Sequence, residues 1–275
     1  KGAGKGTGKM GIKLIVCDID GTLIDKTEVI SERLSTVIDE CRSHGIGFTI
    51  DSGRTRELVK DIVSKLAIKE PYVTANGACI FKEDRCIVYE GFSAEPIKQI
   101  IRESDESGLT VTLSNAYLER ALRETDYVKE HRRLGNRFQK LMPYHEIDWS
   151  ESFIKIMFMD EHRSGKIERI RKLLEAYKNE YWITTYSNTA VEIGPVNCNK
   201  ATGLKKMASL MNVSTDEIMA CGDFNNDYEM ILEAGIGVAV GNACHELKAV
   251  ADYVTQGENY HGVLEAIDKF CYWNK

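Results

Sequence analysis

Short apolar runs that each end in polar side chains follow one another in the first part of the chain. The runs are Leu14–Val16, Ile46–Ile50 and Tyr72–Thr74. Between them, apolar residues recur at intervals of three and four, which is typical of helices with one buried face. Three strand-helix units in succession predict a parallel, doubly wound sheet, in which ligands bind beyond the carboxyl ends of the strands.

From about Ile80 the pattern changes to shorter β-rich pieces separated by helices. The expected strands are Cys86–Phe92, Leu109–Leu113, Ile154–Met159 and Tyr181–Ile193. Helices are expected after Ser93 and over residues 165–178, whereas residues 117–149 are charged, weakly periodic and receive no assignment. This middle part predicts a second α/β unit inserted into the first.

The doubly wound pattern resumes with a helix from Lys200 and closes with three short strands, Ile218–Cys221, Gly237–Val240 and Tyr253–Val254. The predicted fold class is therefore α/β, with a Rossmann-like parallel core and an inserted α/β cap domain. We place the core at residues 10–88 and 195–275, and the insert at residues 89–194. Residues 1–9, KGAGKGTGK, are expected to be a tag or a disordered tail, because a phosphate-binding loop would need Ser or Thr in place of Met10 and a preceding strand.

Composition and charge narrow the class of protein. With 43% hydrophobic and 28% charged residues, the 275-residue chain has the composition of an ordinary globular protein. Its net charge of −6 argues against nucleic acid as a partner, and no apolar run is long enough to predict a membrane span. The eight cysteines form no C-x-x-C pair, and several lie in apolar runs. We therefore expect reduced core thiols, a cytoplasmic location, and a monomer or weak homo-oligomer.

The first apolar run leads directly into two acids, Asp18 and Asp20. Side chains alternate along a strand, so both carboxylates leave the same side of the backbone and could meet one phosphorus atom or one metal ion. An isolated D-x-D could equally be a turn or cap pair. The whole string D-I-D-G-T-L, however, resembles the first motif of the haloacid dehalogenase superfamily, whose members are mostly phosphatases with an aspartate nucleophile.

Hydrolysis of a phosphate monoester needs a nucleophile, a proton donor and neutralised phosphoryl oxygens. Asp18 is the candidate nucleophile, which would form an aspartyl-phosphate, and Asp20 the candidate acid and base. Asp223 follows another strand end, so the Asp18 carboxylate, the Asp20 backbone carbonyl and the Asp223 carboxylate could together bind Mg²⁺.

The charges at such a site must be balanced. Four carboxylates, those of Asp18, Asp20, Asp223 and Asp227, and a phosphate dianion would gather roughly six negative charges. Mg²⁺ would remove two, and a lysine and an arginine two more. Lys200 and Arg54 are the candidates.

The resemblance extends to most of the chain outside the insert. It implies that Ser52, with Gly53 and Arg54 after it, binds the phosphoryl group, and that Lys200 is the lysine of the third motif. The string Gly222–Met230 resembles the fourth motif, which implies that Asp223 binds Mg²⁺. The same motif implies supporting roles for Asn226 and Asp227.

The position of the insert and two short strings outside it resemble one branch of the superfamily. An insert between the second and third motifs implies a C2-type cap, and the strings Asn76-Gly77-Ala78 and Gly241-Asn242-Ala243 resemble the Cof-like, type IIB branch. Members of that branch are chiefly phosphatases of sugar phosphates and similar small metabolites. The chain departs from its pattern at Asp51, where a small residue is usual, and at Ala201, where glycine is usual.

Each candidate also has a structural interpretation. Ser52 and Asn76 could be helix caps, Lys200 a surface lysine, and Asp227 a first-turn acid that interacts with the helix dipole. Four arginines of the insert could be a solvated face or a substrate clamp, namely Arg120, Arg123, Arg132 and Arg133.

The sequence leaves three hypotheses for the function. The favoured hypothesis is an Mg²⁺-dependent phosphatase of a small phosphorylated metabolite. A phosphomutase would share the covalent intermediate and differ in excluding water. A phosphate-accepting regulatory domain, the third hypothesis, carries its aspartate on a middle strand without D-x-D-G-T or a large insert, and fits the sequence less well.

Overall fold

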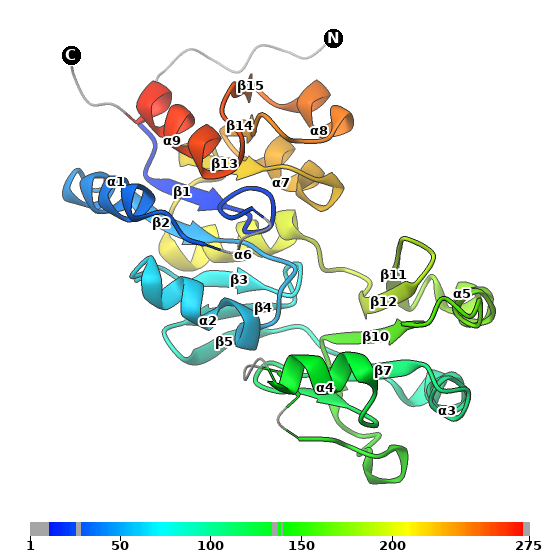
Figure 1. Ribbon diagram of the computed structural model, residues 1–275. Helices are drawn as coiled ribbons and strands as arrows, with labels where there is room; N and C mark the ends of the chain where they lie inside the picture. Colours follow the sequence, from blue (N-terminus) through cyan, green and yellow to red (C-terminus); the bar gives the residue numbers. More distant parts are fainter. Residues whose placement is uncertain (1–10, 26–28, 134–136, 139, 272–275) are drawn as a thin grey trace. The chain divides into compact units, whose positions relative to one another are not determined.

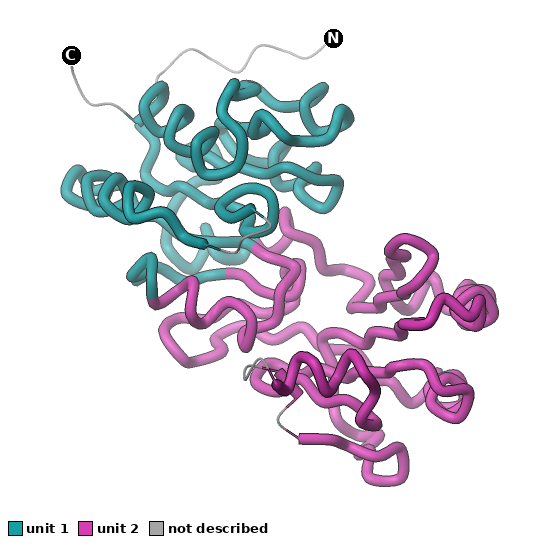
Figure 2. Tube along the Cα trace, in the orientation of Figure 1, with its two compact units in different colours: residues 1–51, 65–72, 204–275 teal, residues 52–64, 73–203 magenta. Residues whose placement is uncertain are grey.

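The computed structural model describes residues 11–25, 29–133, 137–138 and 140–271. The chain divides into two compact units (Figure 2): residues 1–51, 65–72 and 204–275 form the first, and residues 52–64 and 73–203 form the second. Residues 89–194, predicted as the insert, lie within the second unit, which also includes 52–64, 73–88 and 195–203. The domain boundaries drawn from the sequence stay a prediction.

A five-stranded parallel sheet forms the centre of the first unit (Figure 1). Its strand order is β15-β14-β13-β1-β2, and neighbouring strands run parallel throughout. The strands are β1 (Leu14–Cys17), β2 (Gly47–Ile50), β13 (Ile218–Gly222), β14 (Ile236–Ala239) and β15 (Tyr253–Val254). All four residues of β1 are fully buried, as expected for an interior strand of a sheet covered on both faces. The predicted doubly wound core is confirmed.

A helix follows each of these strands in the chain, and another helix precedes β13. These helices are α1 (Glu32–Ser43), α2 (Arg56–Lys65), α6 (Lys200–Met211), α7 (Tyr228–Glu233), α8 (His245–Val250) and α9 (Asn259–Phe270). The helix α1 buries Leu34, Ile38 and Cys41, the face that their spacing predicts. The turn after it contains Gly45, whose φ of +78° and N–H bond to the Arg42 carbonyl complete the helix end that glycine favours.

The second unit contains an antiparallel sheet of order β11-β12-β10-β7-β8. Its strands are β7 (Thr110–Ser114), β8 (Glu119–Ala121), β10 (Lys155–Met159), β11 (Tyr181–Tyr186) and β12 (Ala190–Pro195). Buried residues such as Ile156, Phe158 and Ile193 pack with α3 (Lys98–Glu106) and α5 (Ile167–Leu174) in one hydrophobic core. Because side chains alternate, Lys155, Met157 and Glu192 lie on the opposite face of the sheet.

Three local features differ from the sequence-based expectation. The piece Tyr181–Ile193 is a hairpin of β11 and β12, turned at Ser187 and Asn188, which both have positive φ. The unassigned stretch 117–149 holds β8 and α4 (Asp126–Arg133). The expected third parallel strand, β3 (Tyr72–Thr74), belongs to a separate three-stranded sheet of order β3-β4-β5.

The remaining elements are short. They are β4 (Cys79–Lys82), β5 (Arg85–Tyr89), β6 (Phe92–Ser93), β9 (Ser152–Phe153) and 3₁₀ turns over Glu95–Ile97, Tyr144–Glu146, Glu175–Tyr177, Thr215–Glu217 and Asn225–Asp227. Among the described residues, no helix combines the length and apolarity that crossing a membrane requires.

Candidate active site

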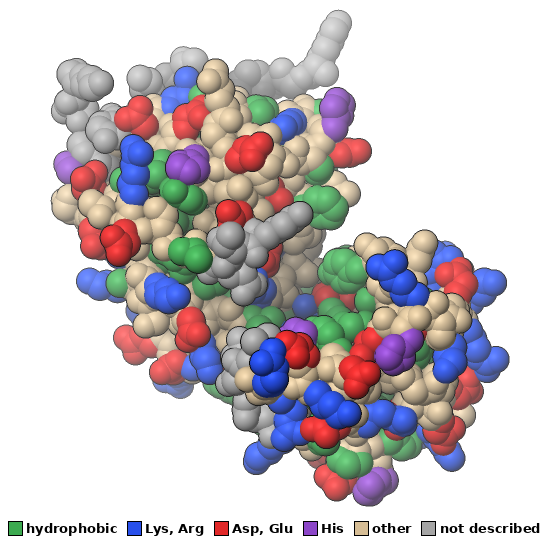
Figure 3. All heavy atoms as spheres, in the orientation of Figure 1, with side chains coloured by type: hydrophobic (Ala, Val, Ile, Leu, Met, Phe, Trp, Pro, Cys, Tyr) green, Lys and Arg blue, Asp and Glu red, His purple; other side chains and the backbone are tan. Residues whose placement is uncertain are grey.

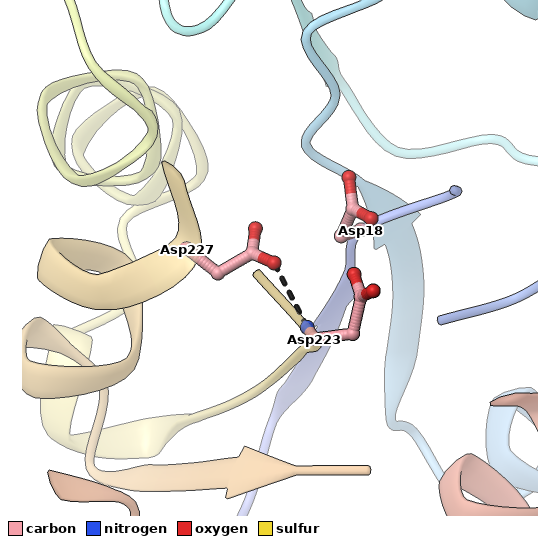
Figure 4. A group of neighbouring side chains, drawn as sticks. All are labelled: Asp18, Asp223 and Asp227. Carbon is pink, nitrogen blue, oxygen red and sulfur yellow. Dashed lines mark hydrogen bonds between the residues drawn. The ribbon is translucent and has the colours of Figure 1, made fainter. Parts of the chain in front are cut away.

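Three carboxylates meet at the carboxyl ends of β1 and β13. The strands are in register at Cys17 and Cys221, and the Asp18 N–H donates to the Cys221 carbonyl at 3.0 Å. One carboxylate oxygen each of Asp18, Asp223 and Asp227 lies within 4.8 Å of the others. Figure 4 shows Asp18 and Asp223 on adjacent strand ends and Asp227 on the turn that leads into α7. The structure therefore brings together three of the four predicted acids at the edge where parallel strands present their ligands.

Asp227 holds the loop that carries Asp223. Its carboxylate accepts the N–H of Asp223 at 2.9 Å and that of Phe224 at 3.1 Å, the first of which is drawn in Figure 4. The residue is fully buried, and a Cβ at Gly222 would lie 2.5 Å from the Asp227 Cβ. These contacts agree with a supporting role, because a carboxylate that accepts backbone N–H groups fixes the position of the loop.

The turn after Asp18 lies directly against Asp223. Gly21 has a φ of +79°, and a Cβ there would be 2.2 Å from the Asp223 Oδ2 atom. Thr22 donates its hydroxyl to the Asp223 Oδ1 atom at 3.3 Å, and Asn242 donates its side-chain N–H to the Gly21 carbonyl at 2.8 Å. Asp20 is exposed on this turn. Asn226, which the resemblance implies as a supporting residue, is also exposed.

The acidic group has the composition of a site for a hard divalent cation. Asp18 is only 5% exposed and Asp227 is fully buried, so their charges repel each other with little screening by solvent. A group of carboxylate oxygens alone, without histidine or cysteine, suits Mg²⁺ or Ca²⁺. The residues present therefore fit a cation of this class.

In the second unit, the loop of Ser52, Gly53 and Arg54 is held by backbone hydrogen bonds to β3 and to the segment after it. Ser52 donates its N–H to the Val73 carbonyl at 3.1 Å, and its own carbonyl accepts the Asn76 N–H at 3.0 Å. A Cβ at Gly53 would lie 3.0 Å from the Asn76 Oδ1 atom. The structure thus brings three predicted residues, Ser52, Gly53 and Asn76, into contact.

The helix-cap interpretation of Ser52 is wrong. The helix α2 begins at Arg56, so Ser52 lies outside its N-cap position. Instead the Ser52 hydroxyl oxygen accepts the N–H of Arg54 at 3.1 Å. The preceding residue, Asp51, is fully buried at the end of β2, and its N–H donates to the Cys17 carbonyl at 3.0 Å.

Lys200 is the first residue of α6 and is only 1% exposed. The surface-lysine interpretation is therefore wrong. Asn199 caps the helix by accepting the Thr202 N–H at 2.8 Å. A Cβ at Gly77 would lie 2.2 Å from the Asn199 carbonyl oxygen, so the Asn76-Gly77 string packs directly against the residue before Lys200.

Lys155 and Glu192 are not among the site residues predicted from the sequence. Lys155 donates to the Gly53 carbonyl at 2.9 Å and forms an ion pair with Glu192 at 3.0 Å. Tyr186 donates its hydroxyl to Glu192 at 3.4 Å. Partial burial raises the pKa of Tyr186, as does the neighbouring Glu192, whereas Lys200 lowers it. The sequence feature that could have pointed to Lys155 and Glu192 is a single charged residue inside each of two apolar runs, I-K-I-M-F-M and A-V-E-I-G.

The four arginines of the insert each contact a carboxylate within the second unit. Arg123 pairs with Asp105, Arg132 with Glu124, Arg133 with Glu130, and Arg120 with Glu151. On the face shown in Figure 3, basic and acidic side chains are interspersed over the region of α4 and α5. The pairs of Arg123, Arg132 and Arg133, whose side chains are 41%, 38% and 71% exposed, favour the solvated-face interpretation over a substrate clamp. Arg120 is instead only 16% exposed and lies over the Phe153 ring.

Comparisons with known proteins agree with this geometry. A family model described as haloacid dehalogenase-like hydrolase matches residues 15–267. A 5-amino-6-(5-phospho-D-ribitylamino)uracil phosphatase of Bacillus subtilis (strain 168) is 30% identical over 256 residues, which cover 93% of this chain and 94% of that protein. A haloacid dehalogenase-like hydrolase from Bacteroides thetaiotaomicron superposes with a TM-score of 0.83 at 24% identity, covering 94% of this chain and 99% of the other. A subclass IIB sugar phosphatase gives 0.77 at 22% identity with the same coverage.

Proposed function

Because the chain belongs to the haloacid dehalogenase-like hydrolase family, in its Cof-like, type IIB branch, and is a phosphatase, we propose that it hydrolyses a small phosphorylated metabolite through an aspartyl-phosphate intermediate, with Mg²⁺ as cofactor. The observation that carries the proposal is the group of three carboxylates at the ends of β1 and β13. The Bacillus subtilis relative is named for a phosphorylated ribityl compound, which supports a sugar phosphate or a similar polyhydroxylated phosphate as substrate.

Asp18 is the proposed nucleophile and Asp20 the proposed acid and base. A carboxylate oxygen of Asp18 forms a bond to phosphorus while the ester P–O bond breaks, and Asp20 gives its proton to the departing alcohol oxygen. In the second step a water oxygen attacks phosphorus, Asp20 takes the water proton, and the bond between phosphorus and Asp18 breaks. Inorganic phosphate leaves and both carboxylates return to their starting states. The exposure of Asp20 beside the buried Asp18 supports this division.

The proposed phosphoryl-binding residues are Ser52, Gly53, Arg54 and Lys200, with Asn76 supporting the loop. The burial of Lys200 supports its role, because a cation withdrawn from solvent interacts strongly with an anion bound beside it. The backbone bonds between Ser52 and Asn76 support a loop that is ordered before substrate arrives.

Asp18, the Asp20 carbonyl and Asp223 are the proposed ligands of Mg²⁺, with Asn226 and Asp227 as supporting residues. The bound ion would neutralise negative charge on the phosphoryl oxygens. Asp227 accepts two backbone N–H groups with one oxygen, which supports its assignment to the loop. We also propose a cytoplasmic site of action, supported by the eight free cysteines, none of which is fully exposed.

The test is the fate of the phosphoryl group. Sugar phosphates incubated with the protein and Mg²⁺ should release inorganic phosphate, which a colorimetric assay measures. A phosphomutase would instead yield positional isomers of the sugar phosphate, which NMR of phosphorus detects. Isomers without free phosphate would contradict the proposal.

The role of Asp20 has its own test. Asp20→Asn should lower kcat/KM, which reports only the first step, by roughly 10²- to 10⁴-fold for alkyl phosphates and by less for p-nitrophenyl phosphate, because p-nitrophenolate leaves without a proton. Asp126→Asn, which changes an acid with 74% of its side chain exposed, is the matched control and should keep normal rates. Equal losses on both substrates would remove Asp20 as the acid.

A further inference from the structure

Lys155 connects the antiparallel sheet to the loop of Ser52, Gly53 and Arg54. It is the first residue of β10, and its ammonium donates to the Gly53 carbonyl at 2.9 Å. The same ammonium pairs with Glu192 at 3.0 Å, and the two side chains are only 12% and 4% exposed. Glu192 lies in β12, opposite Met157 in the register, so it is the diagonal neighbour of Lys155 on one face of the sheet.

The Gly53 carbonyl and the Arg54 N–H belong to the same peptide group. That N–H donates to the Ser52 hydroxyl oxygen at 3.1 Å. Three groups are therefore linked in series: the Lys155 ammonium, the peptide between residues 53 and 54, and the Ser52 hydroxyl. Hydrogen bonds in series polarise one another, so the cation strengthens the N–H bond to Ser52.

These linked hydrogen bonds determine the direction in which the Ser52 hydroxyl can donate its proton. A serine hydroxyl has one proton to donate and two lone pairs to accept with. Because the Arg54 N–H occupies a lone pair, the hydroxyl proton points away from that N–H, and a phosphoryl oxygen is an acceptor for it. The orientation of one peptide group thus sets the direction in which Ser52 donates.

The other carbonyls of the loop have backbone donors. The Ser52 carbonyl accepts from Asn76 and the Arg54 carbonyl accepts from Ala75, at 3.0 and 2.9 Å. The Gly53 carbonyl receives its bond from a side chain of the distant strand β10 instead. Glycine permits the rotation that would turn this peptide over, so an external bond is needed to hold it.

We propose that Lys155, held by Glu192, is a positioning residue for phosphoryl binding that fixes the peptide between residues 53 and 54 and thereby the direction of the Ser52 hydroxyl bond. The inference rests on the proposed function, in which Ser52 binds the phosphoryl group. Lys155 itself need not touch substrate for this role.

The experiment is a double-mutant cycle in the full-length protein. The inhibition constant of inorganic phosphate and the kcat and KM for p-nitrophenyl phosphate are measured for wild type, Lys155→Met, Ser52→Ala and the double variant. Lys155→Met should weaken phosphate binding about 10-fold in the wild-type background and less than about 2-fold in the Ser52→Ala background. The effects should not add, because both substitutions break the same series of hydrogen bonds. Lys155→Arg keeps a cationic donor and should recover most of the lost affinity.

A matched control removes a lysine of the same unit that lies elsewhere. Lys98 pairs with Glu95 and has 51% of its side chain exposed, so Lys98→Met should leave the phosphate constant unchanged. Thermal unfolding checks that each variant is folded, and Lys155→Arg keeps the test open if Lys155→Met does not fold.

The outcomes distinguish the positioning role of Lys155 from the proposed phosphatase function. Equal losses from Lys155→Met in both backgrounds, or no loss in either, would overturn the positioning role while the phosphatase function stands. Failure of Lys155→Arg to bind phosphate better than Lys155→Met would also overturn it. A wild type that releases no phosphate, or a Ser52→Ala variant with normal phosphate affinity, would overturn the proposed function and this inference with it.

Discussion

Two groups of buried charges in this protein have opposite compositions. The acidic group of the first unit places Asp18, Asp223 and Asp227 within 4.8 Å of one another, so its members repel. The group of the second unit joins Lys155 to Glu192 and to a backbone carbonyl, so its members attract. Repulsion within the first group is relieved when a cation binds, whereas the second group is complete within the protein. The first is suited to binding a ligand and the second to holding a loop.

The largest expected effect comes from neutralising one acid. Asp18→Asn should lower kcat for p-nitrophenyl phosphate by about 10³-fold or more, because an amide oxygen is too weak a nucleophile to attack phosphorus. The same change reduces repulsion in the acidic group, so the melting temperature without divalent cations should not fall. Phosphate release and thermal unfolding measure the two effects. Substantial remaining activity would exclude Asp18 as the nucleophile.

Removing divalent cations should abolish the phosphatase activity of the wild-type protein. Addition of EDTA should stop phosphate release, and excess Mg²⁺ should restore it and raise the melting temperature, because the cation binds the folded state. Ca²⁺ should also raise the melting temperature yet fail to restore activity, since its looser coordination lets the Asp18 carboxylate bind it with both oxygens. Equal turnover with Ca²⁺ would contradict this geometry.

A stability measurement separates the members of the acidic group. Asp227→Asn should lower the free energy of unfolding by about 1–3 kcal/mol, because the amide is a poorer acceptor for the two backbone N–H groups that Asp227 now receives. Urea denaturation measures the loss, with Asp126→Asn as a control at an exposed site. A full-stability Asp227→Asn variant would argue against its role in the loop.

The smallest effects are expected at three arginines of the second unit. Single changes of Arg123, Arg132 and Arg133 to Ala should each lower the free energy of unfolding by no more than about 1 kcal/mol, since ion pairs near the surface contribute little. Turnover of p-nitrophenyl phosphate should be unchanged. A large change in preference among sugar phosphates in any variant would instead place that arginine at the substrate.

The first group could be predicted from the sequence and the second could not, for a physical reason. Asp18 and Asp223 directly follow buried strands, and parallel strands bring their carboxyl ends to one edge whatever their order. The pairing of Lys155 with Glu192 depends on the register of β10 and β12, which are separated in the chain by α5 and β11. Local periodicity carries no information on that register.

Parts of the fold could not be predicted from the sequence pattern for similar reasons. The hairpin turn at Ser187 and Asn188 contains no glycine, so the pattern alone shows one long β-rich piece. The strand β3 has the composition of a core strand, yet it is three residues long and belongs with β4 and β5. Lys200 is buried beside Asn199, which packs against Gly77, and local periodicity does not predict such a contact between distant segments.

The place of β1 between β2 and β13 in the parallel sheet has a consequence for the newly made chain. Its register partners on one side, in β2, are synthesised soon after it, but on the other side Cys17 pairs with Cys221, 204 positions later. At the usual 5–20 residues per second, this edge of β1 stays open for roughly 10–40 s of translation. Until β13 leaves the ribosome, Asp18 has no Asp223 beside it. Phosphoryl chemistry is thereby confined to chains in which β13 has already been made.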